Sequence, residues 1–140
     1  LMLQAQSFYY MKGCYLYHYW MNPQSVSHTF AIDKWNDYRK LHTKIEEKFS
    51  NCSQYDFSLQ IELVLLFFVY NAVADIISSL TLNKHDKLKK CNEILSEKRV
   101  KEMFSRIRIL KIPISLKLKI QTAMYKYKIG ITFLIKYNNL

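Results

Sequence analysis

The spacing of apolar residues predicts a chain that is mainly helical after its first thirty residues. Between residues 33 and 49, apolar side chains recur every three or four positions, which places them on one face of a helix. Asp33 is a suitable N-cap for this helix. The predicted face consists of Trp35, Tyr38, Leu41 or His42, Ile45 and Phe49.

A second helix is predicted over residues 57–81, with Asp56 as its cap, and it is apolar nearly all round. The uncharged run between Glu62 and Asp75 holds only 12 residues. A helix that crosses a bilayer needs about 20 apolar residues. We therefore expect this helix to be the buried centre of a protein core and not a membrane span.

A third helical segment begins at Asn83 or Lys84. Its inner side would carry Leu88, Cys91, Ile94 and Leu95, and the apolar face continues with Val100, Met103, Phe104 and Ile107. Ser96 lies between these two groups and could cap a new helix. One kinked helix and two short helices fit this pattern equally well.

A last helix is predicted from Ser115 to about Tyr137, because Pro113 marks a boundary before it. Gly130 would weaken this helix by roughly 1 kcal/mol relative to alanine. Its predicted inner side consists of Leu116, Ile120, Ala123 or Met124, Tyr127, Ile131 and Leu134, and lysines 117, 119, 126, 128 and 136 surround that side.

The first thirty residues follow a different pattern. Residues 7–13 and 14–20 carry seven aromatic side chains and Gly13, which favours short strands over helix. Residues 22–24 then read as a loop. With only two glycines and two prolines, the chain has few places for tight turns, which disfavours an all-β sandwich or barrel. The expected fold class is mainly α: a helical, bundle-like C-terminal region with a short aromatic β element near the N-terminus.

Positive charge is concentrated in the second half of the chain. Residues 1–83 contain 6 basic and 7 acidic residues, whereas residues 84–140 contain 15 basic and 4 acidic residues. Such a basic half can face nucleic acid, an anionic membrane or phosphorylated substrates, or can be a solvated surface only. Lysines beside Leu, Ile and Tyr on a helix are typical of membrane-interfacial helices. Nucleic acid is disfavoured, because the chain has no helix-turn-helix, arginine-rich run or RNP-type strand pair.

Motifs of catalysis and metal binding are largely absent from the sequence. Cys14, Cys52 and Cys91 form no C-x-x-C pair, so we expect reduced thiols in a cytoplasmic protein. The histidines at 18, 28, 42 and 85 show no ligand spacing. There is no glycine-rich phosphate loop, G-x-S-x-G, H-E-x-x-H or D-x-D motif. We predict no catalytic residue, metal site or cofactor within this chain.

One stretch, LMLQAQSFYYMKGCYLYHYWMNPQSVSHTF, carries an ordered series of tyrosines and serines that can be compared with a known motif. It resembles the segment after the catalytic acidic motif in family-2, GT-A-type glycosyltransferases of bacterial surface polysaccharide synthesis. In that family a helix end leads to a short strand and then to a motif of the form Y-x-Y-R-x-x-x-x-S-I-S/T. Here the helix end is LMLQAQ, the strand is SFYYMK and the motif is LYHYWMNPQSVS. Tyr17, Tyr19, Ser25 and Ser27 fall at the expected places, and Trp20 replaces the arginine.

The resemblance implies a function for a longer parent enzyme. Such a transferase would move a sugar from a nucleotide-sugar donor to a surface-polysaccharide or lipid-linked glycan acceptor, with manganese or magnesium on the diphosphate and an acidic base. The groups that hold the metal and activate the acceptor would precede Leu1. Some GT-A enzymes add a histidine metal ligand in this region, which makes His18 and His28 candidates for that role in the parent. The implied substrate-binding residues of this chain are Tyr17, His18, Tyr19, Trp20, Ser25 and Ser27.

The same resemblance divides the chain into two parts. Residues 1–30 would be the end of the GT-A-like domain, and residues 31–140 would be a helical C-terminal region. The chain would then be a fragment that is inactive alone. We expect it at the cytoplasmic side, with the inner face of the cell membrane as the place where its basic half would act. The competing hypothesis is a non-enzymatic basic helical module that binds anionic membrane or nucleic acid.

Overall fold

The computed structural model describes residues 34–50 and 55–137 of the chain, and these form six helices with no strand among them. The helices are α1 (Lys34–Ser50), α2 (Ser58–Ser78), α3 (Lys84–Ser96), α4 (Lys98–Arg106), α5 (Leu116–Tyr127) and α6 (Ile131–Tyr137). The predicted mainly helical class is confirmed. The expected aromatic strands and the Asp33 cap lie outside the described residues.

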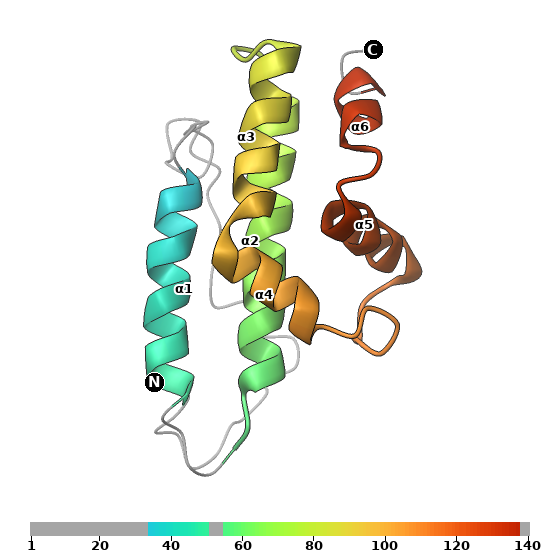
Figure 1. Cartoon of the computed structure of the whole chain (residues 1–140). Helices are drawn as coiled ribbons and strands as arrows, with labels where there is room; N and C mark the ends of the chain where they lie inside the picture. The colour runs from blue at the N-terminus through green and yellow to red at the C-terminus, as the bar shows by residue number, and fades with distance from the viewer. Residues whose placement is uncertain (1–33, 51–54, 138–140) are drawn as a thin grey trace, which may run out of the picture.

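Helix α1 packs along α2, and the two run side by side in Figure 1. Its predicted apolar face is confirmed, and the structure decides the one open choice on it. His42 is buried, whereas Leu41 is exposed. The ring of Tyr38 stacks on Phe68 of α2, with 4.9 Å between the ring centroids. This stacking attaches the first half of α1 to α2.

Helix α2 is the central element, in contact with α1, α3 and α4. It is the one helix of the described chain that is long and apolar enough to cross a membrane. More than half of its most apolar stretch, 56%, is buried inside the protein. Its core side chains include Leu65, Leu66, Val69, Val73, Ile76 and Ile77. The prediction of a buried central helix agrees with this position.

Helices α3 and α4 are two short helices and not one kinked helix. The chain breaks at Glu97, whose backbone is extended with φ −57° and ψ 140°. The expected cap at Ser96 is wrong, because Ser96 is the last residue of α3 and Glu97 takes the cap position. Asn83 does cap α3, since its side chain accepts a hydrogen bond from the backbone N–H of Asp86. The inward residues of both helices, from Cys91 to Ile107, are buried as the periodicity predicts.

The single last helix predicted over 115–137 is wrong, because the chain is broken between α5 and α6. Lys128 adopts the left-handed conformation with φ 55°, and Gly130 follows with φ 81°. Left-handed residues of this kind end a helix, and the N–H of Lys128 bonds back to the carbonyls of Met124 and Tyr125. Ser115 caps the start of α5, as the sequence predicts. The break lets α6 turn back onto α3.

The predicted inner side of α5 is also wrong. Leu116, Ile120 and Tyr127 are 73%, 56% and 64% exposed. The side that faces the protein instead carries Leu118, Thr122 and Tyr125. The hydroxyl of Tyr70 in α2 donates to the carbonyl oxygen of Leu118 at 2.9 Å and is also hydrogen-bonded to Thr122. Because hydrophobic periodicity gives no weight to a threonine or to a tyrosine hydroxyl, it selected the opposite face of the helix.

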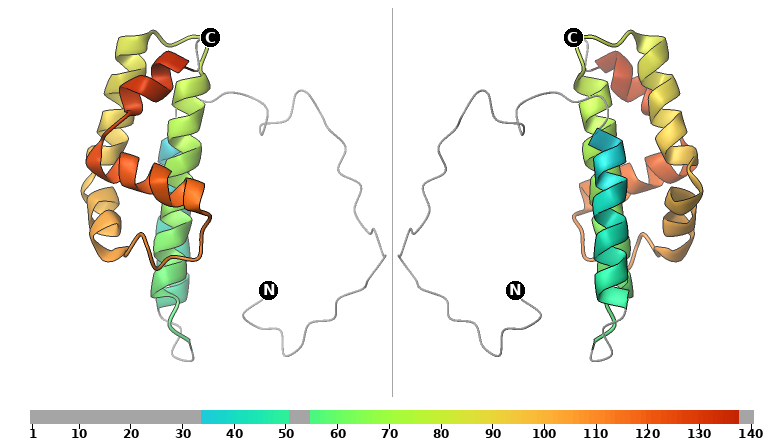
Figure 2. Two further views of the ribbon diagram at one scale, coloured as in Figure 1. Left: turned by 90° about the vertical axis from the view of Figure 1, so that its right-hand side faces the viewer. Right: turned by 90° about the vertical axis from the view of Figure 1, so that its left-hand side faces the viewer.

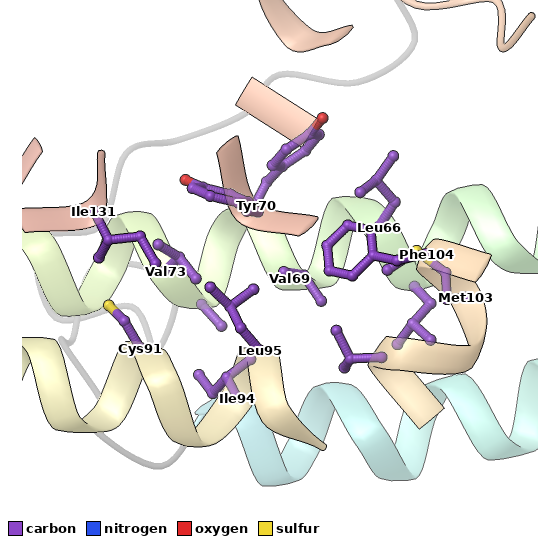
Figure 3. Close-up of a cluster of buried hydrophobic side chains, with 14 of the residues drawn as sticks. Leu66, Val69, Tyr70, Val73, Cys91, Ile94, Leu95, Met103, Phe104 and Ile131 are labelled. Atoms are coloured by element: carbon purple, nitrogen blue, oxygen red, sulfur yellow. The ribbon is translucent and has the colours of Figure 1, made fainter. Parts of the chain in front are cut away.

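The core brings together residues from α2, α3, α4 and α6, as Figure 3 shows. Cys91 of α3 and Ile131 of α6 point toward each other beside Val73. Tyr70 reaches from α2 toward α5, where its ring lies 5.7 Å from that of Tyr125. In Figure 1, α1 and α5 lie on opposite sides of α2.

Candidate functional site

Two features of the described residues could serve a function: a cluster of ion pairs between α1, α2 and α4, and a basic, apolar face on α5 and α6. The ion-pair cluster is centred on the buried carboxylate of Glu62. Arg99 donates to both oxygens of Glu62, at 3.2 and 3.0 Å, and also lies 3.1 Å from Glu46. Arg106 reaches the same carboxylate at 2.9 Å. Glu62 raises the pKa of Arg106, so this guanidinium stays charged.

A hollow of about 300 Å³ adjoins the ion-pair cluster, between the end of α1 and the start of α2. Glu46, Asp56, Glu62 and Arg106 are the charged residues of its wall. Hydrogen bonds from the hydroxyl and the backbone N–H of Ser58 lower the pKa of Asp56. The charged groups of this hollow are thus already paired or tied to a helix start.

The buried polar groups of the described residues are all engaged within the protein. The Nε2 atom of His42 lies 3.1 Å from the carbonyl oxygen of Ile61, and its Nδ1 atom lies 3.8 Å from Glu46. The ammonium of Lys87 donates to the carbonyl oxygen of Ile77 at 2.9 Å. No buried side-chain nitrogen or oxygen in the described ranges lacks a hydrogen-bond partner. These groups therefore hold helices together, as buried polar groups must.

The second feature, which we name the α5–α6 face, combines exposed apolar side chains with positive charge. Leu116, Ile120 and Tyr127 lie within roughly 40° of one another around α5, because a helix turns 100° per residue. Lys117 lies on one side of this stripe, and Lys119 and Lys126 lie on the other. Leu110, Ile129 and Phe133 add exposed apolar side chains before and after α5.

The α5–α6 face belongs to a segment without acidic residues. Residues 107–137 contain Arg108, Lys111, Lys117, Lys119, Lys126, Lys128 and Lys136, and no Asp or Glu. Three of these lysines donate to uncharged groups: Lys119 to the carbonyl of Leu110, Lys126 to that of Phe104, and Lys128 to the hydroxyl of Ser96. Such bonds position the ammonium groups without neutralising them. The face therefore keeps a positive charge.

The sequence-predicted substrate-binding residues lie outside the described part of the chain. This applies to Tyr17, His18, Tyr19, Trp20, Ser25 and Ser27, and also to His28. Within residues 34–50 and 55–137, no three His, Cys, Asp or Glu side chains are grouped so that they could hold a metal ion. Cys91 is a free, buried thiol, and burial raises its pKa to about 11.

Sequence reasoning missed both features of the described region. The ion pairs of the cluster join residues 37 to 53 positions apart, and no motif links them. A signal for the α5–α6 face was present in the absence of acidic residues, but the periodicity turned its apolar stripe inward. Comparison with protein-family models, curated protein sequences and solved structures finds no match to this chain.

Proposed function

We propose that this chain is the C-terminal region of a family-2, GT-A-type glycosyltransferase, and that its helices support the catalytic domain without supplying a catalytic group. The observation that carries the proposal is the motif LYHYWMNPQSVS together with the preceding sequence LMLQAQSFYYMK, for which the resemblance implies a helix end and a strand. In such an enzyme Tyr17, Tyr19, Ser25 and Ser27 would contact the donor or the acceptor. Trp20 would replace the family's charged contact by an aromatic surface, which suits stacking on a sugar ring.

The geometry of the helical region is consistent with a supporting role. Its buried polar side chains are committed to partners within the fold. The ion-pair cluster ties three helices together and leaves Glu62 no free carboxylate oxygen. Residues that act on a substrate need unpaired, accessible groups in a pocket. The donor, the acceptor and a manganese or magnesium ion would thus be bound outside the described helices.

The alternative class is a non-enzymatic basic helical module that binds an anionic membrane or nucleic acid. The observation that favours it is the acid-free, basic segment 107–137. A peripheral contact at the inner face of the cell membrane is compatible with both classes, because glycans with lipid-linked acceptors are built at a membrane. The presence or absence of the acidic residues that hold a nucleotide diphosphate would distinguish the glycosyltransferase from the non-enzymatic module.

The coding sequence before Leu1 provides the most direct test. It should encode an acidic pair shortly before Leu1 and a D-x-D motif further upstream. The 140-residue chain, incubated with nucleotide sugars and manganese, should show neither transfer nor hydrolysis above a blank. Clear turnover by this chain, or an upstream sequence without these acidic motifs, would refute the proposal.

In a protein that includes those motifs, the double variant Ser25→Ala/Ser27→Ala should lower sugar transfer at least tenfold, since hydrogen bonds to substrate are lost. Ser105→Ala is the matched control, because Ser105 is exposed on α4 and donates only to a backbone carbonyl one turn earlier. Equal activity of the double variant and the control would contradict a substrate-binding role for the motif.

A further inference from the structure

Helix α5 presents an apolar stripe to the solvent, although the same chain has an apolar core that could have received it. Leu116, Ile120 and Tyr127 point away from the side where Thr122 and Tyr125 dock on α2. Figure 2 (left) shows α5 lying across α2 on the outside of the protein. Isolated exposed apolar residues are ordinary, but Leu116, Ile120 and Tyr127 are aligned on one side of α5, and the segments before and after α5 expose further large apolar side chains. Aligned exposed apolar side chains of this kind are typical of an interaction surface.

The surroundings of the stripe restrict the partner that would cover it. Lysines flank the stripe on both sides, and the whole segment 107–137 has no acidic residue. A partner must therefore offer apolar groups beneath a negatively charged surface. An anionic lipid bilayer has this layered chemistry, with phosphate groups above acyl chains. A nucleic acid offers the charge but no acyl layer for Leu116 and Ile120.

We propose that α5 docks in the plane of an anionic membrane, with Leu116, Ile120 and Tyr127 inserted below the headgroups. Lys117 and Lys119 on the two sides of α5, together with Lys111 and Lys136, then meet the lipid phosphates. Tyr127 suits the interfacial zone, because its ring is apolar and its hydroxyl stays hydrated. The docking does not depend on the glycosyltransferase proposal, since it uses only residues of α5, α6 and the segment before them.

The apolar stripe of α5 is not needed to fill the protein core, because the opposite side of α5 packs there. The inward side of α5 is already satisfied by the bonds from Tyr70 to Leu118 and Thr122 and by the buried ring of Tyr125. Ser115 and Lys128 define the two ends of α5 by capping bonds. Docking therefore needs no unfolding of the helix and no rotation about its axis.

Vesicle sedimentation of the full 140-residue chain tests the proposal. Vesicles of phosphatidylcholine with about a third phosphatidylglycerol should pellet the chain, and vesicles of phosphatidylcholine alone should pellet much less. Binding should weaken as salt rises from about 0.01 M to 0.15 M, because the Debye length shortens from about 30 to about 8 Å. Residual binding at 0.15 M should come from the inserted stripe.

Two sets of variants separate charge from insertion. Lys111→Gln/Lys117→Gln/Lys136→Gln should weaken binding roughly fivefold for each lysine removed. Lys40→Gln/Lys44→Gln/Lys48→Gln removes the same charge from exposed positions on α1, on the opposite side of α2, and should bind nearly as the parent chain does. Leu116→Gln/Ile120→Gln should weaken binding at least tenfold, whereas the matched pair Leu41→Gln/Leu59→Gln should not.

Fluorescence reports insertion directly. The parent chain contains Trp20 and Trp35, so its spectrum is subtracted from that of each variant. The emission that Tyr127→Trp adds should shift to the blue when anionic vesicles are added, and brominated lipid should quench it. Tyr55→Trp, at a similarly exposed position before α2, should show neither change.

Four results would overturn the proposal. The first is the absence of pelleting with anionic vesicles at low salt. The second is binding that is insensitive to Leu116→Gln/Ile120→Gln. The third is a dimer in solution that dissociates on this double substitution, which would assign the stripe to a second copy of the chain. Tight binding to nucleic acid that depends on the three lysines and not on the stripe, without vesicle binding, would likewise replace the membrane as partner.

Discussion

The region α1–α4 and the region α5–α6 are both helical and both basic, but they handle charge in opposite ways. In the first region the arginines pair with carboxylates: Arg39 with Glu97, Arg99 with Glu46 and Glu62, and Arg106 with Glu62. In the second region the lysines donate to backbone carbonyls and a serine hydroxyl. Charge pairs link the helices of the first region, whereas residues 107–137 contain no acidic residue that could pair with their lysines.

The apolar side chains differ in the same way. In α3 and α4 the residues predicted to lie inward are buried, apart from the partly buried Leu88, and α4 shows the sharpest separation of its apolar and charged sides. In α5 the apolar stripe of Leu116, Ile120 and Tyr127 is exposed. An exposed apolar stripe lowers solubility, and this is part of the ground for proposing that it is an interaction surface. The difference shows that segments of similar Lys, Leu and Ile content can bury their apolar side chains in one region and expose them in the other.

The largest expected effect on stability comes from replacing each of two tyrosines of α5 by alanine, the buried Tyr125 and the exposed Tyr127. Tyr125→Ala should lower the free energy of unfolding by about 3–5 kcal/mol, because a fully buried aromatic ring that packs on Tyr70 is lost. Tyr127→Ala should change it by less than about 0.5 kcal/mol, since this side chain is exposed. Urea unfolding followed by circular dichroism measures both. Equal losses would mean that the stripe with Tyr127 packs inward after all.

A smaller effect is expected from the centre of the ion-pair cluster. Glu62→Gln should destabilise the protein by about 2 kcal/mol, because two guanidinium groups lose their shared carboxylate. The cost stays below that of a fully buried pair, since Arg106 is largely exposed and water screens it.

Glu93→Gln is the matched control for the Glu62 variant. Glu93 is exposed on α3 and is expected to contribute within about 0.5 kcal/mol. Thermal or urea unfolding measures the stability of both variants. If Glu62→Gln were as stable as Glu93→Gln, charge pairing would not be what holds α1, α2 and α4 together.

The smallest expected effect concerns the junction of the two regions, where Cys91 of α3 faces Ile131 of α6 (Figure 3). Burial raises the pKa of this thiol from 9.0 to about 11. The folded protein therefore holds the proton more tightly than the unfolded chain does. The resulting stability is fully present below pH 9 and is lost as the pH rises toward 11, by roughly 1 kcal/mol at pH 10.

Urea unfolding at pH 8, 9 and 10 measures this loss, and Cys91→Ala is the control. The variant should be less stable at every pH because of the cavity it leaves, but it should lose the part of the slope that the thiol contributes between pH 9 and 10. Burial also raises the pKa of Tyr70 and Tyr125, so both proteins retain some loss at still higher pH. Identical slopes for the two proteins between pH 9 and 10 would remove Cys91 as the cause.

The sequence by itself determined where the helical segments up to residue 106 lie, because long apolar faces with regular spacing leave few alternatives. It left open whether α3 and α4 are one helix or two, and α2 ends at Ser78 and not at the predicted residue 81. Helix α1 begins and ends within one residue of its predicted bounds. The buried state of α2 also followed from sequence, since Glu62 and Asp75 limit its uncharged run. The start of α5 at Ser115 could be predicted from a proline and a capping side chain. These are local properties of the chain.

The tertiary structure decided which side of α5 faces the core. Leu116, Ile120 and Tyr127 form the better apolar stripe, but Thr122 and Tyr125 fit a site where the hydroxyl of Tyr70 needs a partner. The break at Lys128 and Gly130 likewise depends on α6 having α3 to pack against. The ion-pair cluster joins Glu62 to Arg99 and Arg106 across 37 and 44 residues of sequence. Periodicity records only how apolar each residue is, and so it could not foresee choices made by hydrogen bonds and charge pairs between helices that are distant along the chain.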